Sequence, residues 1–397
     1  MKERKEILGF PKNVFILGLV SLFMDISSEM IYPLIPLYLN NVLHTSKTSI
    51  GVIEGIAEST ASILKVFSGW LSDRLGKRKS LIFWGYGISV FSRPILATAT
   101  SWVHVLAYRF TDRVGKGVRT APRDAIIADS TRREILGRAF GFHRSMDTVG
   151  AMIGPGIAFA LLGIFQDRLQ TVFWISMVPG ALAILTIALF VKDVKGSRGT
   201  DEPKISLKGF DARFRMFLLI IAVFTLGKTS EAFLVLRAQD LGVRTGLIPV
   251  LYLVFNLVSA SLSTPAGILA DKVGKRRMIL ASYLLFSLVF AGFAFASHAL
   301  HAWILFGIYG LFVAVNEGVQ RAYVATIIKP EIKATGYGIY HTVIGLAALP
   351  SSIIGGALWQ NIGPQALFFY GSAMSLLACA LFVPIVFGGQ RSSAPSP

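Results

Sequence analysis

The sequence predicts an all-α membrane protein of twelve transmembrane helices, arranged as two pseudo-symmetric six-helix bundles. Three observations predict this class: a chain that is 53% hydrophobic and only 15% charged, apolar runs of about twenty residues along its whole length, and a polar ten-residue pattern that occurs twice. A soluble domain would carry about 25% charged residues. Backbone polar groups cannot stay unpaired in lipid, and these runs do not alternate as barrel strands do, so we expect helices.

The repeated pattern is Gly-x-x-x-Asp-[Arg/Lys]-x-Gly-Lys-Arg, and its two copies lie about half a chain length apart. The first copy supplies Gly69, Asp73, Arg74, Gly76, Lys77 and Arg78, and the second supplies Gly267, Asp271, Lys272, Gly274, Lys275 and Arg276. Each copy lies between two long apolar segments. A polar pattern that recurs at half length indicates gene duplication, and therefore two related halves.

The apolar runs give the order of the predicted spans. They cover 14–39, 49–71, 80–99, 102–127, 140–164, 171–191, 214–236, 246–270, 277–297, 301–327, 336–358 and 365–387. The first run has no small-residue cleavage site after it, so we interpret it as a span and not as a signal peptide. The predicted domains are an N-terminal bundle, a polar linker, a C-terminal bundle and a disordered tail, at 1–191, 192–213, 214–387 and 388–397.

The net charge of +17 would suggest a nucleic-acid partner in a soluble chain, but its distribution indicates topology. The two termini and alternate loops hold about 25 Lys and Arg residues, whereas the other loops hold about 4. Both termini are therefore predicted to be cytoplasmic, and we expect a multi-pass protein of a bacterial inner (plasma) membrane with no nucleic-acid partner. The single cysteine, Cys379, excludes a disulfide within the chain, and the scattered histidines predict no metal site.

Ionisable residues inside the spans predict the functional site, because a charge in hydrocarbon is costly and must face protein or water. Asp25 and Glu29 lie four residues apart and share one helix face. The span 102–127 is the most polar, and the acids at 25 and 29 are the natural partners of its cations. The candidate substrate and proton-coupling residues are Asp25, Glu29, Arg109, Asp112, Arg113, Lys116, Lys228, Glu231, Glu317 and Arg321.

Other polar residues in the spans have simpler interpretations. Glu54, Glu58 and Lys65 are expected at a helix edge and in a structural pair, although a direct transport role stays open. His143 and His341 are expected to pack at corresponding places rather than to relay protons. The span 140–164 contains a packing motif of Gly141, Gly150, Gly154 and Pro155. Gly150 and Gly154 lie four residues apart, and small residues at this spacing permit close helix approach in lipid.

Over essentially its full length the chain resembles the major facilitator superfamily. Both copies of the repeated pattern match the loop signature of that family. The stretch from Arg109 resembles its fourth-span motif, Arg-x-x-Gln-Gly-x-Gly, with Asp112 in place of Gln and Arg113 in place of the first Gly. The glycines and proline of the span 140–164 resemble the signature of the proton-coupled drug and metabolite antiporters, with Ala158-Phe159 in place of its terminal Gly-Gly.

The resemblance implies parallel halves around a central site that is lined by the first, fourth, seventh and tenth spans. The implied activity is secondary active transport of a small polar or charged solute by alternating access, most directly proton-coupled efflux of a drug or metabolite. Asp73 would close the inner side by capping the first turn of the span 336–358, where its charge favours exposed N–H groups. We expect a monomer without a cofactor.

Protons are the expected coupling ion, and Asp25, Glu29 and Glu231 are the candidates to carry them. A carboxylate that is alternately desolvated and exposed changes its proton affinity between two states. A permanent ion pair of an acid in the first span with Arg109 or Arg113 is the alternative.

Two other functions stay open. A proton-coupled importer of a polar or anionic metabolite is favoured by the basic excess of the span 102–127, and a non-transporting membrane receptor ranks lower because a sensor needs no paired loops. The chain is not expected to be an enzyme, since it has no nucleophile elbow, phosphate loop or HExxH.

Overall fold

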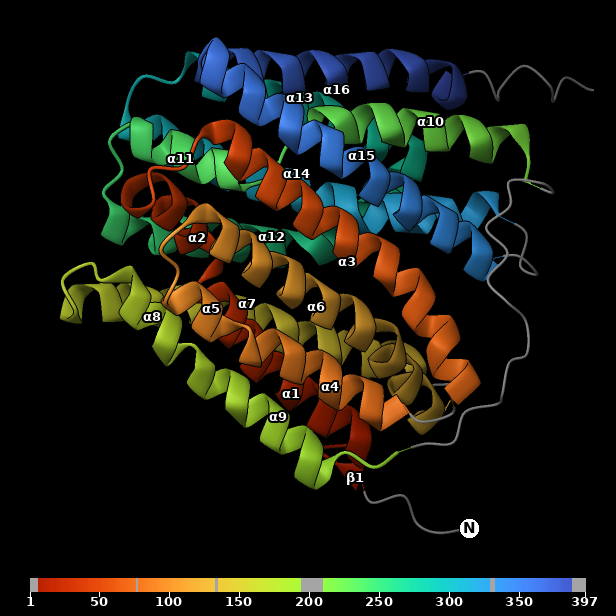
Figure 1. Ribbon diagram of the computed structural model, residues 1–397. Helices are drawn as coiled ribbons and strands as arrows, with labels where there is room; N and C mark the ends of the chain where they lie inside the picture. Colours follow the sequence, from red (N-terminus) through yellow and green to blue (C-terminus); the bar gives the residue numbers. More distant parts are fainter. Residues whose placement is uncertain (1–5, 76–77, 133–134, 194–209, 329–332, 388–397) are drawn as a thin grey trace, which may run out of the picture. The chain divides into compact units, whose positions relative to one another are not determined.

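The computed structural model describes residues 6–75, 78–132, 135–193, 210–328 and 333–387 (Figure 1). These residues are helical apart from short connections and one antiparallel pair of two-residue strands, β1 (Glu6–Ile7) and β2 (Phe10–Pro11). Most of the predicted linker and the whole predicted tail lie outside the described residues, so their boundaries stay predictions.

The chain divides into two compact units. The N-terminal unit comprises Met1–Thr45, Ile56–Pro203 and Arg244–Leu253, and the C-terminal unit comprises Ser46–Gly55, Lys204–Val243 and Val254–Pro397. Two long helices, α3 (Lys47–Leu75) and α12 (Ile248–Val273), therefore contribute residues to both units.

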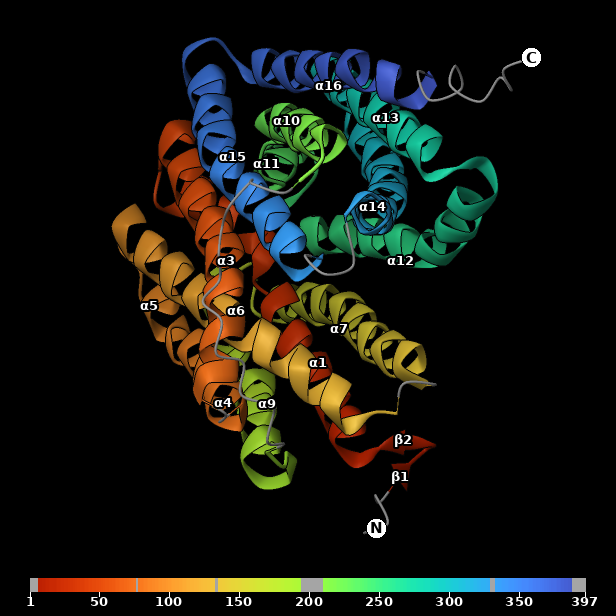
Figure 2. The same cartoon turned by 90° about the vertical axis from the view of Figure 1, so that its right-hand side faces the viewer.

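In the N-terminal unit, α1 packs against α7 and α9, and α4 packs against α6 and α9 (Figure 2). Besides its part of α3, this unit contains α1 (Lys12–Glu29), α2 (Ile35–Leu37), α4 (Arg78–Phe91), α5 (Arg93–Ala97), α6 (Trp102–Ser130), α7 (Leu136–Ile164), α8 (Leu169–Ile175) and α9 (Met177–Phe190). Its core is largely aliphatic and lies between α1, α4, α6, α7 and α9.

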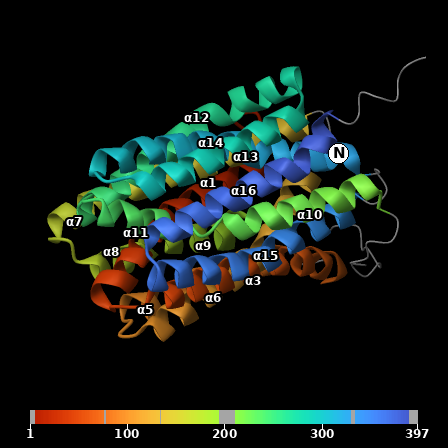
Figure 3. The same ribbon diagram turned by 90° about the horizontal axis from the view of Figure 1, so that it is seen from above.

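The C-terminal unit repeats this pattern of pairing: α10 packs against α15 and α16, and α13 packs against α14 and α16. Figure 3 shows α10, α13 and α16 side by side. Besides its part of α12, the unit contains α10 (Ala212–Gly227), α11 (Ala232–Asp240), α13 (Lys275–Phe295), α14 (Ala299–Ile327), α15 (Lys333–Asn361) and α16 (Pro364–Phe387). The matching pairs agree with the duplication that the repeated pattern predicts.

Nine helical segments of the described part of the chain are long and apolar enough to cross a membrane. The three predicted spans outside this set correspond to α3, to α4 with α5, and to α6. Helix α6 is 29 residues long, so its charges and not its length set it apart. The all-α membrane class is confirmed, whereas the number of twelve spans and the cytoplasmic side of the termini stay predictions.

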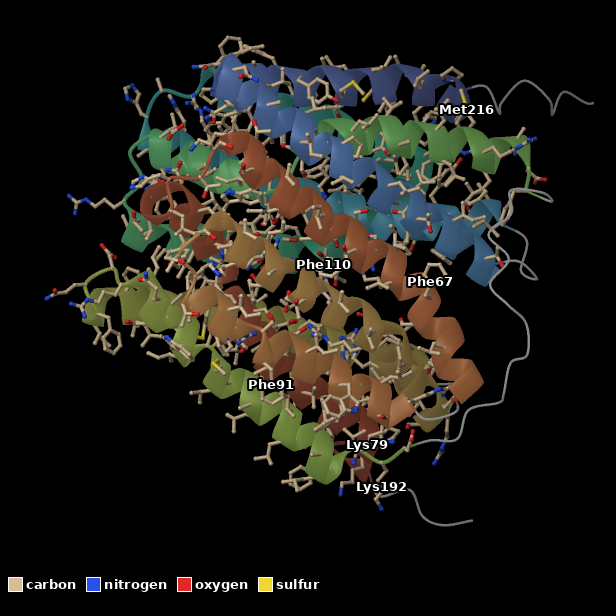
Figure 4. The ribbon with its side chains drawn as sticks, in the orientation of Figure 1. Phe67, Lys79, Phe91, Phe110, Lys192 and Met216 are labelled. Carbon is tan, nitrogen blue, oxygen red and sulfur yellow. The ribbon has the colours of Figure 1, made fainter. Side chains whose placement is uncertain are left out.

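Apolar side chains also cover the outside of the units, as expected of surfaces that face lipid. Phe91 on α4 is 66% exposed and points outward in Figure 4, and Phe295 at the end of α13 is 75% exposed. Polar anchoring occurs at the helix ends instead. Lys79 donates to the carbonyl of Ala188, and Asn13 donates to the carbonyl of Lys192.

Two buried arginines, Arg93 and Arg237, hydrogen-bond to groups at helix interruptions and helix ends. Arg93 lies where α4 gives way to α5, and it donates to the Ser27 hydroxyl on α1 and to Ser176 beside α9. Arg237 on α11 donates to the carbonyls of Phe293 and Ala296, at 3.1 and 2.7 Å, where α13 ends. Each guanidinium thus satisfies polar groups that a helix interruption or helix end leaves without an intrahelical partner.

Replacing Arg237 by Ala is expected to lower the thermal midpoint of the purified protein. The change leaves two buried carbonyls unsatisfied, which costs about 1–3 kcal/mol each. Tryptophan fluorescence during heating in one detergent would measure the midpoint. Arg244→Ala, at an exposed arginine, is the matched control and should leave the midpoint unchanged. Equal midpoints for both variants would contradict the bracing role.

Candidate functional site

The first long helix of each unit is interrupted at the predicted acids. Helix α1 ends at Glu29 and is followed by a 3₁₀ turn at Tyr32–Leu34, because Pro33 and Pro36 lack the N–H groups that would continue the helix. Helix α10 ends at Gly227, and Glu231 directly precedes α11. Aligning Phe15 with Phe217 places Glu29 on Glu231, so the two acids occupy the same place in the duplicated chain. Each unit therefore places a carboxylate where its first helix is interrupted.

Close packing of α1 against α7 fixes the position of the first-helix acids. A Cβ added to Gly150 would lie 2.7 Å from the Leu22 carbonyl oxygen and 2.9 Å from the Asp25 Cβ. A Cβ added to Gly154 would lie 2.9 Å from the Glu29 Cβ. These two glycines therefore let the backbone of α7 lie directly against the acidic face of α1, which agrees with small residues at a helix crossing in lipid.

The other residues of the predicted glycine motif behave differently. A Cβ at Gly141 would meet nothing within 4 Å, so Gly141 is not part of the crossing. Helix α7 also continues through Pro155 to Ile164 without interruption. Close helix approach is therefore present at Gly150 and Gly154, and the antiporter-type role of the motif stays a prediction.

An acidic pair forms across this crossing. The carboxylate of Asp147 on α7 accepts a hydrogen bond from the Ser21 hydroxyl of α1 and lies 3.6 Å from Nδ1 of His143. Asp25 lies one turn after Ser21 on α1, and its Cβ lies against Gly150, three residues after Asp147 on α7. The crossing therefore places two acids on facing helices, and Lys116, Arg119 and Arg123 of α6 are near enough to act on Asp25.

A second cluster joins α6 to the segment that follows α1. The guanidinium carbons of Arg109 and Arg113 lie 5.2 and 5.8 Å from the centre of the Tyr32 ring. That ring contacts Tyr252 edge to face at 5.8 Å. Arg113 also lies 3.4 Å from the carboxylate of Glu58. Both arginines are buried, so the cluster holds two cations against aromatic faces in a desolvated place.

Arg113 does not form the expected ion pair with an acid of α1. Its carboxylate partners are Glu58 at 3.4 Å and Asp112 at 3.9 Å. Glu58, expected in a structural pair with a direct transport role left open, thus lies beside the charged residues of α6. Lys116 is exposed on α6, and Arg119 donates to the Ser89 hydroxyl of α4 at 2.6 Å.

In the C-terminal unit, aromatic side chains lie beside the predicted residues Glu231 and Lys228. Glu231 accepts from the Tyr309 hydroxyl at 3.4 Å, and Lys228 lies 5.8 Å from the centre of the Phe312 ring. Ser230 donates at 3.2 Å to Glu54, a buried residue that sequence analysis placed at a helix edge. The pair of Glu317 and Arg321, at 3.2 Å, is about half exposed and lies along α14.

Next to this region the C-terminal unit contains a buried network of neutral polar side chains. Gln320 donates to the Asn316 side chain at 2.8 Å and to the Tyr283 hydroxyl at 3.0 Å, and it accepts from Tyr340 at 3.1 Å. Sequence analysis missed this network because neutral polar residues carry no charge to single them out. Their spacing of four on α14 was the available signal.

The two repeated loops are described to different extents. The described part of the structure does not include all of the first copy: it leaves out Gly76, Lys77 and the side chains of Asp73 and Arg74. Arg78 is buried and pairs with Asp129 at the end of α6. The predicted capping by Asp73 therefore stays a prediction.

In the second copy, Lys275 pairs with Asp271 at 2.6 Å, and Arg276 donates to the carbonyl of Ile385. Gly274 has a φ of +101°, a conformation that favours glycine, and it separates α12 from α13. The second glycine of the pattern is thus required by the turn. A Cβ at Gly267 would meet nothing within 4 Å, so its role is not one of packing.

Asp147 is the most important residue that sequence analysis did not select. It lies three residues before Gly150, so it shares the face of α7 that meets α1. That spacing was visible in the sequence, whereas the identity of the facing helix was not. Among the described residues, no group of three or more His, Cys, Asp or Glu side chains could hold a metal ion.

The interrupted helices, the duplicated packing and the intramembrane charges together define a polytopic membrane transporter. The model of the Major Facilitator Superfamily matches residues 17–230 and again 216–396. The chain belongs to this superfamily.

Known proteins resemble the chain over nearly its full length. The uncharacterised MFS-type transporter MJ1317 of Methanocaldococcus jannaschii is 35% identical over 388 residues, which cover 96% of this chain and 97% of the relative. The multidrug resistance protein MdtG of Escherichia fergusonii is 21% identical and covers 97% of this chain and 95% of its own length. A crystal structure of the nucleoside transporter NupG has a TM-score of 0.80 at 14% identity, with 94% and 99% coverage.

We expect Gly150→Ala to destabilise the protein and Gly141→Ala to leave it unchanged or slightly more stable. The added methyl group of the first variant would overlap α1, and overpacking costs about 1–3 kcal/mol. The second variant gains about 0.5–1 kcal/mol of helix propensity in open space. Thermal midpoints of the two variants in the same detergent measure the difference, and a Gly150→Ala midpoint at or above that of Gly141→Ala would contradict the crossing.

Proposed function

We propose that the chain is a proton-coupled antiporter that exports a small polar or charged solute by alternating access. The observation that carries the proposal is the placement of two acids at the crossing of α1 and α7: Asp147 accepts from Ser21, and Asp25, one turn further along α1, lies against Gly150. Two carboxylates in one crossing can share a proton, because protonation of one removes the repulsion between them. The cations of α6 stabilise the ionised pair, so that both protonation states are accessible.

The acids link protonation to the shape of α1. Protonation lowers the repulsion between α1 and α7, and deprotonation restores it. Helix α1 ends at Glu29, four residues after Asp25, so the chain can change direction next to the acid pair. Interrupted helices near a midplane site are typical of transporters in which one repeat moves against the other. Glu29 and Glu231 are the proposed further sites of protonation.

The repeated loops are the proposed inner gate. The buried pair of Arg78 and Asp129 fixes the end of the first loop to α6, which supports a rigid attachment of this loop to the N-terminal unit. Asp73 and its neighbours in the loop are proposed to close the inner side in one state. We propose a monomer in a bacterial inner membrane with both termini on the cytoplasmic side.

The direction of transport is proposed from two supporting facts. The chain carries Gly150 and Gly154 of the antiporter-type motif at the crossing, and its relatives include MdtG, whose name describes a multidrug resistance protein. Efflux of a drug or metabolite is consistent with both facts.

Import of an anionic metabolite together with protons is the second candidate. Arg109 and Arg113 place two cations beside the ring of Tyr32, which contacts Tyr252, and guanidinium groups bind carboxylates and phosphates in a bidentate manner. An aromatic or anionic solute would suit this cluster. The two candidates differ in the direction in which solute moves when a pH gradient is imposed.

Purified protein in liposomes with an imposed pH gradient tests the proposal. Drugs, siderophore-like compounds, sugars, amino acids and metal ions are screened as solutes, and solute should move against the proton flow. Asp25→Asn and Asp147→Asn should each lower gradient-driven transport at least tenfold while solute exchange without a gradient continues. Asp167→Asn, at an exposed outer-loop residue, is the control and should transport normally.

Two results would decide against antiport. Movement of solute in the same direction as protons would favour the symporter, and full gradient-driven transport by Asp147→Asn would remove the acid pair from the mechanism. Glu29→Gln tests the second proposed protonation site in the same assay, and its unimpaired coupling would leave the acid pair as the proton site of this unit.

A further inference from the structure

The C-terminal unit contains a cavity of about 610 Å³ at the end of the helices where the second repeated loop lies. Helix α10 begins at this cavity, α12 passes into α13 beside it, and α14 and α16 end there. The charged residues of its lining are Asp211, Arg213, Asp271, Lys275, Arg276 and Arg277. All of them belong to the C-terminal unit, and none belongs to the charged site described above.

The cavity has an excess of positive charge. Lys275 is neutralised by Asp271, which lies 2.6 Å away. Arg276 donates to the carbonyl of Ile385 at 3.1 Å. Among the described residues, no carboxylate pairs with Arg213 or Arg276 within 4.0 Å, and the same is true of Arg277. Three guanidinium groups therefore line one cavity with a single remaining acid, Asp211.

The helix ends do not produce this excess. The first turns of α10 and α13 carry partial positive charge, but the last turns of α12 and α14 carry partial negative charge at the same place. These contributions oppose one another, so the side chains decide the sign. Arginine is the residue that matches phosphate oxygens with paired N–H donors, and a cluster of arginines is typical of phosphate recognition.

The apolar part of the lining indicates how the anion arrives. Val273, Ile327 and Val386 line the cavity beside the arginines, and Val273 is 41% exposed. Leu269, one turn earlier on α12, is 47% exposed. A lipid would meet both surfaces, with its headgroup among the arginines and its acyl chains along α12. The cavity also lies on the side predicted to be cytoplasmic, where anionic lipids attract basic residues.

We propose that this cavity binds the phosphate group of an anionic phospholipid. The three guanidinium groups can donate paired N–H bonds to phosphate oxygens. A soluble phosphate is the other possible source of the same group. The site uses no residue of the acid pair or of the Tyr32 cluster, but it shares Asp271, Lys275 and Arg276 with the second repeated loop of the proposed gate. Its test therefore measures lipid binding and not transport.

The test uses the full-length protein and two matched double variants. Arg213→Gln with Arg277→Gln removes two cations of the cavity. Arg215→Gln with Lys272→Gln removes two cations from the same segments, but neither residue lines the cavity. Each protein is equilibrated with phosphatidylglycerol or phosphatidylcholine in detergent, and retained lipid is counted by native mass spectrometry. In a second arm, inorganic phosphate is added to phosphatidylcholine nanodiscs and the thermal midpoint is measured.

The wild type and the Arg215/Lys272 variant should retain phosphatidylglycerol in preference to phosphatidylcholine. The Arg213/Arg277 variant should retain less phosphatidylglycerol, by about fivefold for each arginine removed, which corresponds to about 1 kcal/mol per basic residue near anionic lipid. A midpoint raised by inorganic phosphate in the wild type alone, without lipid preference, would support the site and assign it to soluble phosphate. Equal retention by all three proteins together with no effect of phosphate would overturn the proposal, provided that their midpoints in phosphatidylcholine agree.

Discussion

The close crossing of α1 and α7 is the interaction on which the charged site of the N-terminal unit depends. Gly150 and Gly154 have no side chain to separate the helices, so the backbones meet at the positions of Asp25 and Glu29. A side chain at either glycine would push α7 away and remove Asp147 from its place opposite Ser21. Carboxylates are costly in an apolar bundle unless other groups compensate them. Helix α6 supplies that compensation through its cations.

The duplicated scaffold carries different chemistry in its two units. Helices α1 and α10 are interrupted at corresponding places, and their packing partners correspond as well. Gly141 and Gly150 of α7 have the same spacing as Gly336 and Gly345 of α15, and this alignment pairs Asp147 with Thr342. The Thr342 hydroxyl donates to a carbonyl of its own helix. The acid pair is therefore particular to the N-terminal unit. The C-terminal unit instead holds the network around Gln320, where neutral side chains satisfy one another without charge.

Much of the fold was predictable because lipid restricts the possible structures severely. Long apolar runs had to be helices, and the repeated loop showed that the two halves are related. The interruption after Glu29 could be expected from the prolines that follow it. The interruption at Lys228 could not be expected from proline, since none is near it, and only its alignment with Glu29 indicated the position.

The site was predictable in its charged residues and not in their partners. Charges in a span mark a site, so Asp25, Arg109 and Arg113 could be selected from the sequence alone. Their partners depend on which helix faces are in contact, which a single sequence does not determine. Arg113 meets Glu58 and not an acid of α1, and Asp25 has a second acid near it in addition to the cations of α6.

Infrared difference spectroscopy between acidic and alkaline pH tests the acid pair most directly, because it detects the C=O band of a protonated carboxyl group without a transported solute. The wild-type protein should show a band that disappears on deprotonation and that is lost in both Asp25→Asn and Asp147→Asn. Loss in both variants would identify one proton that the two residues share. A band that persists unchanged in both variants would contradict the account, because the titrating group would then lie outside the crossing of α1 and α7.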